Sequence, residues 1–276
     1  MIGISAFGLY LPAYRLTREV IAQATGGKSL SGERTVANYD EDALTMGVEA
    51  SLECMDNYAH AWGVPLNGKM LRALFFASTS SPYREKHASS VISSVLEVDP
   101  TALVTDLGGS LRGGLTAMKL GGQLLKESGP DKRVLVVTAD KRAAEPRSVE
   151  EQSFADGAVA VLLEQQNVVA SLEAHTAVNA NFPHFWRREN DQYVQSGDTR
   201  FVETYGYLPL MSEVIRDLLK KGGLKSSEVA KLIVYAPNPR LAQRLARSLG
   251  FKPETQLANT FFNNVGDTAH PRFFSA

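Results

Sequence analysis

Cysteine and long apolar runs are scarce in this chain of 276 residues. The single cysteine, Cys54, excludes an intrachain disulfide and a thiolate metal cluster, and His87 and His175 have no metal-ligand spacing. No apolar run reaches the roughly 20 residues that cross a bilayer. The N-terminus lacks the charged region and the cleavage site of a signal peptide. We therefore expect a cytoplasmic protein that binds neither a metal nor a membrane.

The charges are nearly balanced, with 29 Lys and Arg residues against 30 Asp and Glu residues and a net charge of −1. This balance does not favour nucleic acid as a partner. Apolar residues make up 44% and charged residues 21%, which is the composition of a folded globular protein. The length is consistent with two similar halves or with one large α/β domain.

Short apolar runs alternate with helical patterns along the chain. We expect strands at 2–11, 73–77, 102–107, 133–139, 157–163, 168–174 and 232–235. We expect helices at 40–58, 87–96, 110–126, 210–221 and 240–249. Continuous apolar strands between helices favour a largely parallel, buried sheet, and the strands at 157–163 and 168–174 are expected to be adjacent. An aromatic- and Arg-rich stretch, 181–207, is expected to form an irregular insertion.

A glycine-flanked turn joins the strand at 102–107 to the next helix. Residues 105–114 read TDLGGSLRGG, in which Gly108 and Gly109 permit a sharp turn and a close approach of the backbone to a ligand. Ser110 is placed to cap the helix, whose free N–H groups create a positive spot. The stretch matches neither the nucleophile elbow nor a phosphate loop. A packed turn and a ligand-binding turn therefore both remain open.

Eight segments of the chain carry a family resemblance. They are IGISAFGLYLPAYRL, YDEDALTMGVEA, SSPYREKHASSVISSVL, the turn just described, RVLVVTADKRAAEP, FADGAVAVLL, HFWRREND and YAPNPRLAQRLARSLGF. In this order they resemble archaeal-type hydroxymethylglutaryl-CoA synthases of the thiolase superfamily. The resemblance implies a thiolase-like α/β fold, in which two duplicated halves with mixed five-stranded sheets stack as α-β-α-β-α. We expect 1–165 to form the first half and 166–276 the second.

The same resemblance implies a helix and two strands after the glycine turn at 265–267, and the sequence ends at Ala276. We therefore expect an incomplete second half, in which 260–276 pack poorly because a sheet without two strands exposes an edge.

The family's four catalytic positions carry other residues here. Its acyl-accepting Cys, its His, its Asn and its Glu fall on Leu111, Tyr235, Asp267 and Thr79. A Leu side chain cannot form a thioester. The nearest hydroxyl is that of Ser110, and Cys54 lies in an apolar helical pattern typical of a buried structural thiol. Claisen condensation through a cysteinyl thioester is therefore not expected.

Two classes of function remain open. In the first, the chain is an acyl-CoA-binding subunit of an acyl-CoA-processing complex, without condensation activity. The resemblance implies a homodimer with a zinc-ribbon and OB-fold partner. Acyl-CoA would be the only small ligand, held by Arg187, Arg188, Gly108 and Gly109. The bland alternative for the two arginines is a solvated charge cluster.

In the second class, the chain is a thiolase-fold carbon–carbon lyase that cleaves a β-hydroxyacyl-CoA in a retro-aldol step. Tyr235 would act as the base, with Asp267 in the pocket and His270 as a substitute base. The structural alternatives are a packed strand-end aromatic residue and a turn residue. Lys141 and Arg142 are expected at the surface. An active protein would thus be an aldolase or another member of the acyltransferase superfamily.

Overall fold

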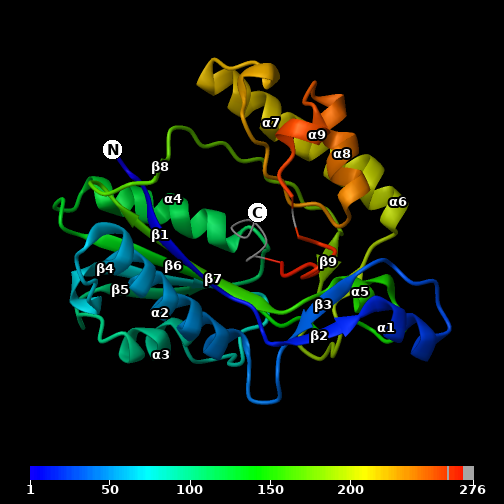
Figure 1. Ribbon diagram of the computed structural model, residues 1–276, viewed down its shortest axis with the longest axis horizontal. Helices are drawn as coiled ribbons and strands as arrows, with labels where there is room; N and C mark the ends of the chain where they lie inside the picture. Colours follow the sequence, from blue (N-terminus) through cyan, green and yellow to red (C-terminus); the bar gives the residue numbers. More distant parts are fainter. Residues whose placement is uncertain (260, 270–276) are drawn as a thin grey trace.

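The computed structural model describes residues 1–259 and 261–269, and a six-stranded sheet forms its centre (Figure 1). From one edge to the other, the strands are β5 Leu103–Leu107, β4 Leu71–Ala77, β6 Arg133–Asp140, β7 Gly157–Glu164, β1 Gly3–Tyr10 and β8 Ala170–Ser171. Only β5, β4 and β6 run parallel; β6, β7, β1 and β8 alternate in direction. The prediction of a largely parallel sheet is therefore wrong. A strand covered on both faces has a continuous apolar sequence whichever way it runs.

Helices cover both faces of this sheet (Figure 1). Helices α2 Ala43–Trp62 and α3 Ala88–Val95 pack on one face, and α4 Gly113–Lys126 packs on the other. Successive side chains of a strand point to opposite faces of the sheet, so one strand contributes to both apolar clusters. Phe76 belongs to the first cluster and Phe75 to the second. A capping box at Asp42 begins α2, where its carboxylate accepts a hydrogen bond from Thr45 N.

Three predicted elements differ from those observed. The helix expected at 110–126 begins at Gly113, because the glycine turn continues through Arg112. The strand expected at 168–174 is reduced to β8, and β1 separates it from β7. The segment 232–235 forms only a single parallel bridge between Leu232 and Leu257. Short apolar runs do not identify a pairing partner, so the sequence predicts longer strands than these two segments form.

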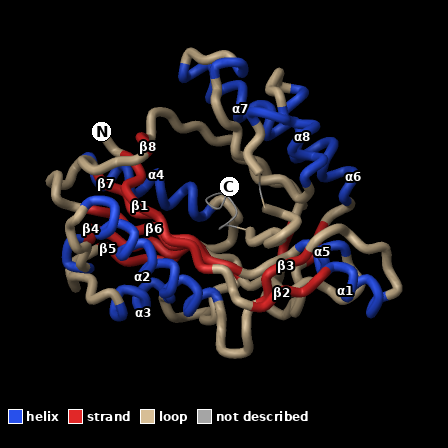
Figure 2. Tube along the Cα trace, in the orientation of Figure 1, coloured by secondary structure: helices blue, strands red, loops and turns tan. Residues whose placement is uncertain are grey.

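The region after 165 contains helices and long loops (Figure 2). Helices α7 Leu208–Gly222, α8 Pro239–Ser248 and α9 Pro253–Gln256 lie around a third apolar cluster. The insertion at 181–207 contains a short hairpin, β9 Phe185–Trp186 and β10 Gln195–Ser196, followed by α6 Thr199–Phe201 and a π-helical segment, Val202–Tyr207. Within the described residues, no helix combines the length and hydropathy needed to span a bilayer.

Segments that lie far apart in the chain come together at one edge of the fold. Strands β2 Tyr14–Thr17 and β3 Glu33–Val36 form a hairpin around α1 Arg18–Thr25. Thr35 N donates to Val265 O at 2.8 Å. On the other side, Asp267 N donates to Ser153 O at 2.7 Å, directly after α5 Val149–Ser153. Residues 263–267 therefore lie between β3 and the segment after α5.

The expectation that 260–276 pack poorly is wrong for 266–269, whereas Phe261, Asn263 and Asn264 are exposed. Asp267, Thr268 and Ala269 are buried, because the backbone pairing to β3 and to Ser153 draws this segment into the protein. Residues 260 and 270–276, including His270, lie outside the described residues.

Candidate functional site

Two of the predicted site residues, Tyr235 and Asp267, are in direct contact. Tyr235 Oη donates a hydrogen bond to Asp267 Oδ2 at 2.9 Å. The other carboxylate oxygen, Oδ1, accepts a hydrogen bond from Ala269 N at 3.0 Å. Tyr235 is half-buried and Asp267 is buried. The structure thus brings together two of the side chains that the sequence analysis predicts as catalytic.

Arg142 supplies the counter-charge of Asp267. Its Nη2 lies 3.6 Å from Asp267 Oδ2, a distance that makes an ion pair and is too long for a hydrogen bond. The guanidinium carbon lies 3.9 Å from the ring centroid of Phe154 and 5.6 Å from that of Phe185. The expectation of a surface position is wrong for Arg142, which is buried, and holds for Lys141, which is exposed. Phe185 comes from the insertion, which folds back over the end of β6.

His184, which the sequence analysis did not select, also lies in the surroundings of Asp267. The ring of His184 stacks on Phe185 at a centroid distance of 4.0 Å. Burial lowers the pKa of His184, partly opposed by the nearby charge of Asp267, so the imidazole favours its neutral form. His184 begins the HFWRREND segment of the family resemblance, of which the sequence analysis selected only the two arginines. Only the fold of the insertion brings its imidazole near Asp267.

Thr79, which the sequence analysis predicts at the family's Glu position, is held by a buried carboxylate at the end of β6. Asp140 Oδ1 accepts hydrogen bonds from Thr79 N at 2.8 Å, from Thr79 Oγ1 at 2.9 Å and from Ser80 Oγ at 3.0 Å. Asp140 is fully buried. Position 79 therefore carries a hydroxyl group instead of a carboxyl group. This hydroxyl helps to hold the ends of β4 and β6 together. An Asp directly after an apolar strand was the available sequence signal for this network.

The turn before α4 places Ser110 and Leu111 outside the helix. Gly109 adopts φ +74°, a left-handed conformation that favours glycine. Ser110 is exposed, and its Oγ accepts a hydrogen bond from Arg112 N at 3.2 Å. Arg112 occupies the helix cap without a side-chain bond, so the predicted Ser110 cap does not form. Leu111 is half-buried.

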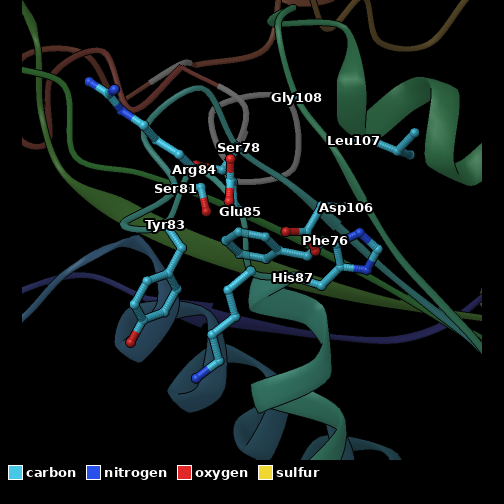
Figure 3. Close-up of a pocket in the computed structure, with 11 residues that line it drawn as sticks. Phe76, Ser78, Ser81, Tyr83, Arg84, Glu85, His87, Asp106, Leu107 and Gly108 are labelled. Atoms are coloured by element: carbon cyan, nitrogen blue, oxygen red, sulfur yellow. The ribbon is translucent and has the colours of Figure 1, made fainter. Parts of the chain in front are cut away.

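A cavity of about 440 Å³ lies beside this turn, at the ends of β4 and β5 (Figure 3). Gly108 lines it together with Ser78, Ser81 and residues of the loop before α3. Figure 3 shows the side chains of Asp106 and His87 close to each other at its wall. Asp106 accepts hydrogen bonds from Ala88 N and Ser89 N and so fixes the start of α3.

The two predicted phosphate-binding arginines are exposed residues of the insertion. Arg187 Nη2 donates to Thr79 O at 2.9 Å, and the backbone N–H of Arg188 donates to Asp191 Oδ2 at 2.8 Å. A contact between Arg84 and Glu189 also joins the insertion to the loop after β4. The insertion therefore covers the same end of the sheet as the networks described above.

The single thiol is remote from reactive surroundings. Cys54 is fully buried within α2, as expected, and burial raises the pKa of its thiol to about 12. Among the described residues, His, Cys, Asp and Glu side chains form no group of three that could hold a metal ion.

Comparison with known proteins confirms the family resemblance. No family model matches the chain. The hydroxymethylglutaryl-CoA synthase of Pyrobaculum neutrophilum is 28% identical over 97% of this chain and 76% of its own length, and that of Methanocaldococcus jannaschii is 27% identical over 97% and 77%.

Solved structures confirm the thiolase-like fold. A hydroxymethylglutaryl-CoA synthase complexed with CoA has a TM-score of 0.85 at 18% identity, over 99% of this chain and 73% of that one. 3-Oxoacyl-(acyl carrier protein) synthase III from Pseudomonas aeruginosa has a TM-score of 0.81 at 18% identity, over 99% and 87%. The chain is thus similar in sequence to hydroxymethylglutaryl-CoA synthases and has their fold.

Replacing Asp267 by Asn tests the buried ion pair. We expect Asp267→Asn to lower the free energy of unfolding by about 3–5 kcal/mol, because it leaves the Arg142 guanidinium buried without its counter-charge. The double variant Asp267→Asn, Arg142→Met should recover most of this loss, since the thioether fills similar space between the aromatic rings. Urea unfolding of the single and double variants measures both. Additive losses would contradict the pairing.

Proposed function

We propose that the chain binds acyl-CoA as a hydroxymethylglutaryl-CoA synthase-like protein and does not catalyse Claisen condensation through a cysteinyl thioester. In this proposal it acts in the cytoplasm as a subunit of an acyl-CoA-processing complex. The observation that carries it is the Tyr235–Asp267–Arg142 network. Where the resemblance places a His and an Asn, this chain has a phenol bonded to a carboxylate that is itself ion-paired.

The proposal is supported by the absence of a suitable nucleophile at the family's position. Leu111 has no nucleophilic atom. Cys54 is buried in α2 with a strongly raised pKa, so thiolate is scarce at neutral pH. Ser110 is exposed, and a solvated turn lacks the dry surroundings in which fixed dipoles stabilise an oxyanion strongly.

The ligand class is supported by the named relatives and neighbours. One structural neighbour is a hydroxymethylglutaryl-CoA synthase complexed with CoA, and another contains 3-hydroxy-3-methylglutaryl coenzyme A. In this chain we assign the polar end of the ligand to Arg187 and Arg188, whose forked donors suit phosphates. The turn at Gly108 and Gly109 would contact the remainder, where the backbone is free of side chains.

Calorimetry with acetyl-CoA tests binding and chemistry separately. We expect acetyl-CoA to bind and the variant Arg188→Ala to bind it more weakly, by about tenfold, because a charge-assisted phosphate contact is lost. Radiolabelled acetyl-CoA should leave no acyl group on the protein after denaturation, because Leu111 cannot accept it. A stable acyl-enzyme would overturn the assignment, and no binding at millimolar ligand would remove acyl-CoA as the ligand class.

A second candidate is the retro-aldol cleavage of a β-hydroxyacyl-CoA, favoured by the hydrogen bond from Tyr235 to Asp267. The Tyr235 oxygen would take the β-hydroxyl proton as its own proton passes to the Asp267 carboxylate. The Cα–Cβ bond then breaks, and a carbonyl compound leaves. The electron pair of the broken bond stays on the acyl-CoA fragment, which becomes a thioester enolate. Return of the proton to Cα completes the reaction, so that no covalent acyl-enzyme and no oxidant are needed.

Product analysis distinguishes this candidate from the first. If the chain is a lyase, a β-hydroxyacyl-CoA should yield a carbonyl compound and a shorter acyl-CoA, and Tyr235→Phe should lower the rate at least about 100-fold. Tyr205→Phe, at a side chain that is 67% exposed, is the matched control and should leave the rate unchanged. Recovery of the bound substrate unchanged would contradict lyase activity and would support only the acyl-CoA-binding role.

We further propose a homodimer formed through the unpaired edge of β5, together with a zinc-ribbon and OB-fold partner. Strand β5 is one edge of the sheet, and Leu103 on it is 47% exposed. Light scattering should find a dimer that Leu103→Lys dissociates. Leu172→Lys, next to the opposite edge at β8 and 43% exposed, should leave the dimer intact. A monomeric wild-type protein would contradict this assembly.

A further inference from the structure

A second cavity, of about 380 Å³, lies between the β2–β3 hairpin and the end of β6. Arg34 and Val36 of β3 form one wall, and Lys141 to Ala144 form another. Glu151 of α5, Phe154 and Asp156 complete the lining. The volume is in the lower range of cavities that hold small molecules. Arg142 belongs both to this cavity and to the ion pair with Asp267.

Two guanidinium groups of this cavity have unused hydrogen-bond donors. Within the part of the chain that the structure describes, Arg34 Nε and Arg142 Nε and Nη2 are shielded from solvent and have no hydrogen-bond partner. Arg34 uses Nη1 to donate to Phe154 O at 3.2 Å. A buried donor without an acceptor costs about 1–3 kcal/mol. A small rotation of either group toward the cavity would let a bound oxyanion provide the missing acceptor.

The charged groups of the cavity lining favour an anion. Arg34, Lys141 and Arg142 line the cavity against the carboxyl groups of Glu151 and Asp156, and Asp267, outside the lining, is the ion-pair partner of Arg142. Burial raises the pKa of Asp156, opposed by a hydrogen bond from Ala37 N, which shifts this carboxyl toward its neutral form. The Lys141 ammonium already donates to the backbone carbonyl of Glu41 at 2.7 Å. The two arginines are therefore the groups available to a ligand.

We propose that this cavity is a binding subsite for the carboxylate of a small organic monoanion, held by Arg34 and Arg142. The planar fork of a guanidinium matches the two oxygens of a carboxylate. Val36, Ala37 and the Phe154 ring provide apolar surface for a short carbon chain. This subsite is separate from acyl-CoA binding, since its argument uses neither Arg187, Arg188 nor the turn at Gly108.

Occupancy of the subsite would reach Tyr235 through one side chain. Arg142 lines the cavity, and its Nη2 also lies 3.6 Å from Asp267 Oδ2. A carboxylate bound at Arg142 competes with Asp267 for the same guanidinium, and Asp267 accepts the hydrogen bond of Tyr235. The ligand therefore changes the electrostatic surroundings of the phenol without touching it.

Fluorine NMR with 4,4,4-trifluorobutyrate tests the subsite, with the neutral 4,4,4-trifluorobutyramide as its isostere. We expect millimolar binding of the acid to the full chain, seen as line broadening, and none of the amide. Arg34→Gln should weaken binding at least about tenfold, since a charged hydrogen bond is lost. Arg15→Gln is the matched control on the neighbouring strand β2, where Arg15 pairs with Glu33 at 3.8 Å outside the cavity, and it should bind within about twofold of wild type.

Each other outcome contradicts the proposal. Equal broadening of the acid and the amide would show that the charge is not recognised. Equal losses in Arg34→Gln and Arg15→Gln would place the effect outside the cavity. Displacement of the acid by inorganic phosphate at lower concentration would replace a carboxylate subsite with a phosphate site. The comparison of acid and amide on the wild-type protein stands even if Arg34→Gln does not fold.

Discussion

The backbone pairing of residues 263–267 with β3 and with Ser153 is the constraint on which the site depends. Backbone hydrogen bonds, among them those donated by Thr35 N and Asp267 N, fix this segment between parts of the chain more than a hundred residues away. Fixed in this way, Asp267 is buried beside Arg142 and within reach of Tyr235. A carboxylate in that place requires a cation, because an unpaired buried charge is far more costly than a paired one. The rings of Phe154 and Phe185 lie against the guanidinium that provides this cation.

In this thiolase-like fold, four of the residues singled out in the sequence belong to two polar networks around buried carboxylates. One joins Tyr235, Asp267 and Arg142, and the other joins Thr79 to Asp140. Both networks hold the end of the sheet to the segments around it. The first network is only partly satisfied, since Arg142 Nε and Nη2 have no hydrogen-bond partner among the described residues. The same contacts leave the phenol of Tyr235 hydrogen-bonded to the carboxylate of Asp267.

Much of the fold could be predicted from the sequence, because periodicity and length mark buried strands and helices directly. The contact of Tyr235 with Asp267 was foreseeable only through the family resemblance, since the two residues belong to different elements. Arg142 and His184 could not be placed. Their surroundings come from the insertion, and nothing in the local pattern says where an irregular segment folds back. The direction and pairing of strands were also hidden, since apolar runs covered by helices look the same in either orientation.

The pairing of 263–267 with β3 also orders events during synthesis. Ribosomes add about 5–20 residues per second, and early domains fold as they emerge. Arg142 and β3 leave the ribosome before Asp267 does, so neither the ion pair nor the backbone pairing of β3 can form until 263–267 have been made. Until then, the β3 backbone groups that pair with 263–267 lack this partner, as those of an edge strand do.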